Sequence, residues 1–189
     1  MSQNKTNFAV PLAFVGMMFF AIGFALGINS FLIPVLKGAL SLPSGVAYLL
    51  LAATFVPFLI FGYPASATIA KIGYKRTMAL SFLIFAVAFI LFVLSAKLEN
   101  FILFLIASFV SGAANAYLHA SVNPYITILG PIESAAKRMS IMGICNKLAW
   151  PVAPLFFALV VADQTNVQTS DLYLPFYIII GVFLLLGII

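Results

Sequence analysis

Charge is scarce in this sequence of 189 residues, of which only 7% are Asp, Glu, Lys or Arg. A soluble domain carries about 25% charged residues. Hydrophobic residues make up 65% of the chain, and no soluble fold could hide so much apolar surface from water. The scarcity of charge therefore excludes a water-soluble protein and predicts an all-α protein that lies in a lipid bilayer.

Residues that build metal and redox sites are equally rare. The single cysteine, Cys145, lies inside an apolar run, so the chain has no disulfide framework and no CxxC metal site. One histidine excludes a bis-histidine haem site within the chain. The four acids lie between apolar runs and form no close pair that could hold a metal; they are Glu99, Glu133, Asp163 and Asp171. We therefore expect no metal, no cofactor and no enzymatic activity, with a membrane-embedded enzyme as the least favoured alternative.

Long apolar runs are what the sequence has in place of charge. A helix rises 1.5 Å per residue, so about 20 apolar residues cross the hydrocarbon core of a bilayer. Six runs satisfy this length, and short segments rich in charge, glycine or proline separate them. The predicted transmembrane helices span residues 11–36, 46–70, 77–96, 101–128, 139–161 and 172–189.

The basic residues are divided unevenly between the two sides of the predicted bundle. Cytoplasmic segments of membrane proteins carry an excess of Lys and Arg, which predicts a multi-pass protein of the cell inner membrane with a cytoplasmic N-terminus. The same rule explains the basic charge without a nucleic-acid partner. Lys5, Lys71, Lys75, Arg76, Lys137 and Arg138 then lie inside, Lys37 and Lys97 lie outside, and Lys147 is left within a span.

The last predicted span reaches Ile189 with neither a basic flank nor a cap. We expect the chain to be a fragment that stops where a cytoplasmic loop would begin. The alternative is a natural six-helix protein with a bare end.

Two ionisable residues, His119 and Lys147, lie deep inside predicted spans. Their distance from the nearer span end corresponds to roughly 12–15 Å of helix. A charge at membrane depth costs about 2.5–3.5 kcal/mol on insertion scales, and such residues usually face a protein-lined cavity. We therefore expect both residues to contact a ligand near the middle of the membrane.

Uncharged polar residues accompany this pair. Asn115, His119 and Asn123 recur at four-residue spacing, which places them on one helix face. Lipid cannot satisfy their hydrogen bonds, so this face must meet protein or water. Interhelical packing is the alternative explanation for each of these residues. The predicted substrate-binding residues are Asn29, Ser30, Asn115, His119, Asn123, Asn146 and Lys147.

Small residues and prolines punctuate the spans. The GxxxG pattern at Gly23 and Gly27 is expected to let two helices approach closely. Prolines are expected to interrupt the second and fifth spans, since broken helices recur in transporters. The prolines concerned are Pro57, Pro64, Pro151 and Pro154.

The stretch Asn123-Pro-Tyr-Ile-Thr-Ile-Leu-Gly-Pro-Ile-Glu-Ser-Ala-Ala-Lys-Arg138, continuing into Met142-Gly-Ile-Cys-Asn-Lys147, resembles the fucose/glucose/galactose permease family of the major facilitator superfamily. Gly23-Phe-Ala-Leu-Gly-Ile-Asn-Ser30 is similar to the first helix of that family. Lys71-Ile-Gly-Tyr-Lys-Arg76 lies where the superfamily has a basic loop, although the acidic residue of that motif is absent. The resemblance covers nearly the whole chain but only the N-terminal six of twelve spans.

The resemblance implies a transporter that carries a monosaccharide of the glucose, galactose or fucose class by alternating access between two six-helix halves. The sugar would bind between the halves. In fucose-type members one acid on the first helix and one on the fourth serve recognition and proton coupling, and those positions are Ser30 and His119 here. Asn146 matches a polar position of the fifth helix, whereas Lys147 replaces a small residue.

Two mechanisms stay open at this point. A cation-coupled symporter would use a proton or sodium, with His119 as the proton-coupling candidate because imidazole titrates near neutral pH. An uncoupled facilitator would need no such group. The expected partners in either case are the monosaccharide, the lipid bilayer and the missing C-terminal half of the same chain.

Overall fold

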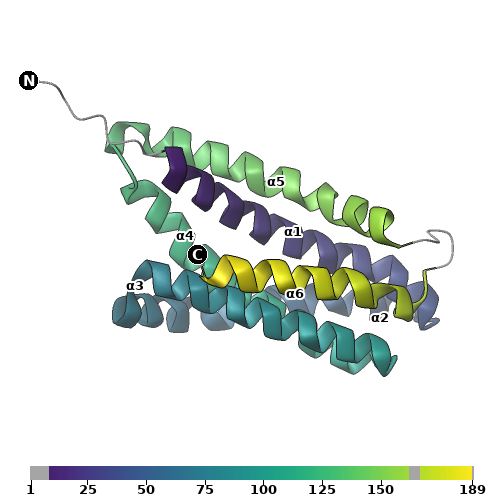
Figure 1. Ribbon diagram of the computed structural model, residues 1–189. Helices are drawn as coiled ribbons and strands as arrows, with labels where there is room; N and C mark the ends of the chain where they lie inside the picture. The colour runs from purple at the N-terminus through teal and green to yellow at the C-terminus, as the bar shows by residue number, and fades with distance from the viewer. Residues whose placement is uncertain (1–8, 162–166, 189) are drawn as a thin grey trace, which may run out of the picture.

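The computed structural model describes residues 9–161 and 167–188, and within them it contains helices and no strand (Figure 1). The predicted all-α membrane fold is therefore confirmed. Lys5, Asp163 and Ile189 lie outside the described residues. The helices are α1 (Ala9–Ala39), α2 (Ser44–Ala47), α3 (Leu49–Lys97), α4 (Phe101–Ile128), α5 (Ala135–Val160) and α6 (Tyr173–Ile188), with the short helices η1 (Ile132–Ser134) and η2 (Thr169–Leu172).

Helix α3 crosses the bundle twice. Its 49 residues would extend about 74 Å if straight, more than twice the thickness of a hydrocarbon core. At Gly73 the backbone leaves the helical region, with φ 80° and ψ 169°, a conformation that a side chain would strain. The first arm (residues 49–72) runs away from α2 and the second arm (residues 74–97) returns (Figure 1). The five long apolar helices therefore make six crossings.

The helices continue through the prolines that were expected to interrupt them. Pro57 and Pro64 lie inside the first arm of α3, and Pro151 and Pro154 lie inside α5. A proline removes one backbone hydrogen bond, but neighbouring groups in a bundle can compensate for it and the helix continues. The predicted interruptions are therefore wrong, and the reversal of the chain occurs at a glycine instead.

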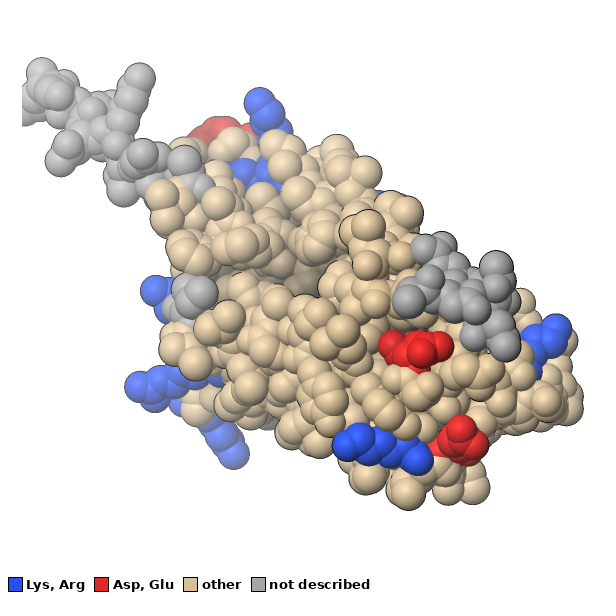
Figure 2. Space-filling model, turned by 45° about the vertical axis from the view of Figure 1, so that its right-hand side comes forward, with Lys and Arg blue, Asp and Glu red and all other residues tan. Residues whose placement is uncertain are grey.

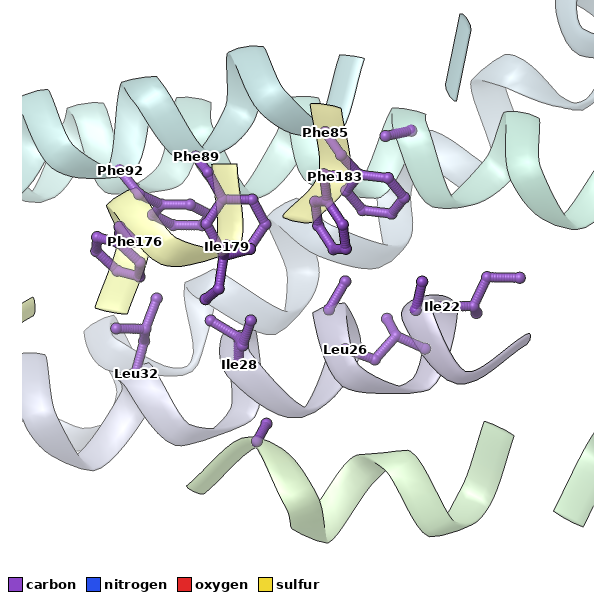
Figure 3. Packing of buried hydrophobic residues seen from close by; sticks show 14 of the residues in the cluster. Ile22, Leu26, Ile28, Leu32, Phe85, Phe89, Phe92, Phe176, Ile179 and Phe183 are labelled. Atoms are coloured by element: carbon purple, nitrogen blue, oxygen red, sulfur yellow. The ribbon is translucent and has the colours of Figure 1, made fainter. Parts of the chain in front are cut away.

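A cluster of phenylalanines fixes α6 to the second arm of α3. Phe183 lies 4.8 Å from Phe85, and Phe176 lies 5.4 Å from Phe92, measured between ring centroids. Aromatic pairs at these distances add to the stabilisation from burial. Figure 3 shows these rings beside apolar residues of α1, including Ile22, Leu26, Ile28 and Leu32.

Apart from Lys147, the described charged residues lie toward the two ends of the bundle. Figure 2 shows one face on which the blue and red side chains lie in groups toward its edges, with a wide uncharged region between the groups. The bend at Gly73 and the junction between α4 and α5 lie at the same end as the start of α1 (Figure 1), which we call the Gly73 end. Lys71, Lys75, Arg76, Lys137 and Arg138 gather there, while Lys37 and Lys97 lie at the opposite end.

The GxxxG pattern of α1 packs against α5. A Cβ atom added at Gly23 would lie 1.9 Å from the backbone oxygen of Asn146, and one added at Gly27 would lie 2.4 Å from that of Trp150. These distances leave no room for a side chain, so the expected close approach of two helices is confirmed. The contact holds α1 and α5 together over slightly more than one helical turn.

Replacement of Gly23 by alanine is expected to push α1 and α5 apart, because the new methyl group would meet backbone. Overpacking of this kind costs roughly 1–3 kcal/mol. Thermal unfolding of the detergent-solubilised protein, followed by circular dichroism, should show a lower midpoint. Gly143→Ala is the matched control, because its Cβ would meet nothing within 4 Å. Equal midpoints for the two variants would contradict the account.

Candidate functional site

Lys147 lies near the middle of α5 with its side chain exposed. It follows Ala135 by 12 residues, which is about 18 Å of helix. Its Nζ atom lies 5.3 Å from the centroid of the Trp150 ring, within the range of a cation–π contact. No carboxylate of residues 9–161 or 167–188 forms an ion pair with it. An ammonium group this deep requires a face that water can reach.

His119 belongs to the neighbourhood of Lys147. The imidazole is half-buried on α4 and lies 5.8 Å from the ring centroid of Phe58 in the first arm of α3. The charge of Lys147 acts on this imidazole electrostatically. Residues from α3, α4 and α5 therefore form one face, which we call the cationic face and define by Phe58, His119, Lys147 and Trp150.

Asn123 and Ser30 are also partly accessible. Asn123 lies one turn beyond His119 on α4 and is half-buried. Ser30 on α1 is half-buried, and its hydroxyl donates to the carbonyl of Leu26 at 3.1 Å. This internal bond satisfies the serine within its own helix, so Ser30 needs no ligand in the present arrangement.

Asn29 on α1 and Asn115 on α4 are instead fully buried. The Asn29 amide donates to the carbonyl of Ala25 at 3.0 Å and to the Ser111 hydroxyl at 3.4 Å. The Asn115 amide donates to the carbonyl of Ser111 at 3.3 Å. These bonds favour the packing explanation, because neither side chain can touch a solute unless the helices move. Three buried side-chain oxygens of α1 and α4 lack a partner among the described residues, namely Asn29 Oδ1, Asn115 Oδ1 and Ser108 Oγ.

Asn146 points away from its neighbour Lys147. Its amide donates to the carbonyl of Phe19 at 3.0 Å, which joins α5 to α1. Adjacent residues of a helix project about 100° apart, so one of this pair can face α1 while the other faces outward. Asn146 therefore joins the close contact at Gly23, and Lys147 belongs to the cationic face.

The apolar groove between α1, α5 and α6 is separate from these residues. Its volume is about 390 Å³, and its lining includes Met17, Phe24, Phe156 and Val182. None of the predicted substrate-binding residues lines it. A polar solute is better served by the cationic face, which is an open surface in this chain.

Residues 14–189 match the Major Facilitator Superfamily. The chain belongs to this superfamily. A glucose/galactose transporter of Brucella abortus biovar 1 (strain 9-941) is 31% identical over 193 residues, covering 100% of this chain and 47% of the relative. The L-fucose-proton symporter of Escherichia coli (strain K12) is 26% identical over 168 residues, covering 89% of this chain and 38% of the relative. The predicted family is confirmed, and these relatives are transporters rather than enzymes.

A solved structure shows the same fold. The superfamily transporter FucP in the outward conformation aligns with a TM-score of 0.78 at 24% identity, covering 96% of this chain and 49% of that chain. The chain thus spans about half the length of the transporters that it matches. Six membrane crossings in one compact bundle agree with this coverage.

Arg138 is a structural residue that the sequence alone presented only as a topology signal. Its side chain is buried and turns back to the end of α4, where it donates to the carbonyls of Ile126 at 3.2 Å, Thr127 at 3.1 Å and Pro131 at 2.8 Å, and to the Ser134 hydroxyl. The last carbonyls of a helix lack partners and carry partial negative charge. Arg138 therefore clamps α4 to α5. The sequence feature that could have indicated this structural role is the position of Arg138 at the end of the long Asn123–Arg138 motif.

Arg138→Gln is expected to destabilise the protein, because it leaves buried carbonyls without their charged donor. Lost hydrogen bonds to a charged group cost roughly 1.5–3 kcal/mol. Thermal unfolding in detergent should show this loss, whereas Lys137→Gln, at the exposed neighbouring position, should leave the midpoint unchanged. Similar midpoints for Arg138→Gln and the wild type would refute the clamp.

Proposed function

We propose that this chain forms one half of a transporter that moves a monosaccharide of the glucose, galactose or fucose class across the inner membrane by alternating access. The observation that carries the proposal is the exposed Lys147 near the middle of α5, beside His119. A face with hydrogen-bonding groups at this depth suits a polyol that must leave water to cross the bilayer. The similar proteins, which include glucose/galactose transporters and L-fucose-proton symporters, support this substrate class.

The cationic face would form half of the sugar site. A second six-helix half opposite α4 and α5 would enclose the sugar between the two bundles, as in other transporters with internal repeats. His119 and Asn123 would bond sugar hydroxyls, and Trp150 would offer its ring to the apolar side of the sugar. The remaining substrate-binding candidates are Asn29, Ser30, Asn115 and Asn146. Ser30 is partly accessible, whereas the three buried asparagines could contact a sugar only after the helices move.

Alternating access needs each half to move as a rigid unit. The Gly23 contact, the Arg138 clamp and the phenylalanine cluster tie α1, α5, α4, α3 and α6 into one body. Rocking of this body against the second half would expose the sugar to one side of the membrane at a time. With the Gly73 end in the cytoplasm, the N-terminus would lie inside, in agreement with the basic residues of that end.

Coupling to a cation is part of the proposal. The described helices carry no acid in their interior, so His119 is the proton-coupling candidate of this half, because an imidazole can bind and release a proton. An uncoupled facilitator is the second candidate, because the same lack of acids leaves few proton sites. Sodium is the other possible coupling ion.

Uptake of a labelled sugar panel by cells that express the complete transporter tests the site. His119→Ala and Lys147→Ala are each expected to lower the initial rate at least tenfold, because each removes a group of the cationic face. Lys137→Ala, on the same helix but at the Gly73 end, should transport like the wild type. Wild-type rates in both site variants would remove these residues from the sugar site.

The same cells distinguish the two mechanisms. Collapse of the proton gradient should abolish uphill accumulation by a proton symporter, and removal of sodium should do so for a sodium symporter. Accumulation only to equilibrium, unchanged by either treatment, would establish the facilitator.

A further inference from the structure

The ionisable groups described in the proposed sugar site are all cationic or neutral. Lys147 brings a positive charge to the middle of α5, and the other ionisable group beside it is an imidazole, which is neutral or positive. The contact that the structure gives the ammonium is the face of Trp150 at 5.3 Å. An aromatic ring attracts a cation but carries no negative charge.

The described carboxylates, Glu99, Glu133 and Asp171, lie toward the ends of the bundle and form no ion pair with Lys147. Glu99 accepts a hydrogen bond from the Thr169 hydroxyl at 3.0 Å, and Asp171 accepts one from the backbone of Gln168 at 2.9 Å. Glu133 lies in η1, before α5 begins, and Asp163 follows the end of α5, outside the described residues. Lys147, about 18 Å from the start of α5, is therefore without a counter-charge among the residues that the structure describes.

Hydrogen bonds to the hydroxyls of a neutral sugar do not by themselves require a full charge. An amide such as Asn or Gln could donate hydrogen bonds to sugar hydroxyls without the cost of holding an ammonium group in the membrane. An anionic solute does give a reason, because its carboxylate would pair with the ammonium in a charge-assisted hydrogen bond. The pairing would be strongest when the closed site excludes water.

We propose that the solute is an anionic monosaccharide, a hexuronate whose carboxylate pairs with Lys147 while its hydroxyls bond to His119 and Asn123. This inference rests on the proposed function, since it names the substrate class of the same face. The ring of Trp150 lies beside the ammonium, so an apolar face of the sugar can stack on it while the carboxylate reaches Lys147. Lys147 is thus the residue that determines specificity for charge.

Proteoliposomes that contain the complete transporter test the inference by uptake of radiolabelled D-glucuronate, D-galacturonate and D-glucose at equal concentration. The wild type should take up a hexuronate faster than D-glucose, and the unlabelled hexuronate should compete with labelled glucose. Lys147→Gln should lower the ratio of hexuronate to glucose uptake at least tenfold. Lys147→Arg, which keeps the charge, should retain the hexuronate preference, and Lys137→Gln should leave both rates unchanged.

The alternative outcomes separate the two claims. Glucose uptake with no hexuronate uptake or competition would overturn the anionic substrate and leave the proposed sugar transport standing; a carboxylate of the second half would then be the partner of Lys147. Hexuronate uptake whose preference survives in Lys147→Gln would also overturn the role of this residue. No uptake of any of the three sugars, by a transporter that elutes as a single folded species, would contradict the proposed function and the inference together.

Discussion

An ammonium group held near the middle of a membrane-spanning helix, with no counter-charge in residues 9–161 and 167–188, is the constraint on which the arrangement of this bundle depends. Lys147 tolerates neither lipid nor a dry core, so one face of α5 must be reachable by water. The opposite face of the same helix must then supply all of its packing. Asn146 and the backbone near Gly23 and Gly27 do this, because they bind α5 tightly to α1.

The groups that hold the bundle together are separate from those of the cationic face. Close backbone contact joins α1 to α5, the phenylalanine cluster joins α3 to α6, and Arg138 joins the end of α4 to the start of α5. Each contact is buried, while Lys147, His119 and Asn123 keep some exposed surface. This division lets one half move as a rigid body while its polar face stays free to meet a solute.

The fold could be predicted from the sequence because six apolar runs of membrane-spanning length leave few alternatives. The rotation of each helix about its own axis could not be predicted from the sequence. Asn115 looked equivalent to Asn123 in spacing, yet Asn115 is completely buried, as is Asn29 on α1. Likewise Arg138 appeared as one more basic loop residue, because its carbonyl partners at Ile126 and Thr127 become neighbours only after the chain turns at Gly130 and Pro131. The interruptions predicted at the prolines were wrong because the surrounding bundle compensates for the backbone hydrogen bond that each proline removes.

Access of water to position 147 tests the central claim most directly. Lys147→Cys, in a complete transporter with Cys145 and any other cysteine replaced, would be treated with a membrane-impermeant thiol reagent that reacts with thiolates in water. Val87→Cys on the second arm of α3, an exposed apolar position, is the comparison for a surface that faces lipid. The account predicts rapid labelling at position 147 and none at position 87. Absence of labelling at position 147 in a folded, membrane-inserted protein, whichever side the reagent is applied to, would contradict the existence of a wet face beside α4 and α5.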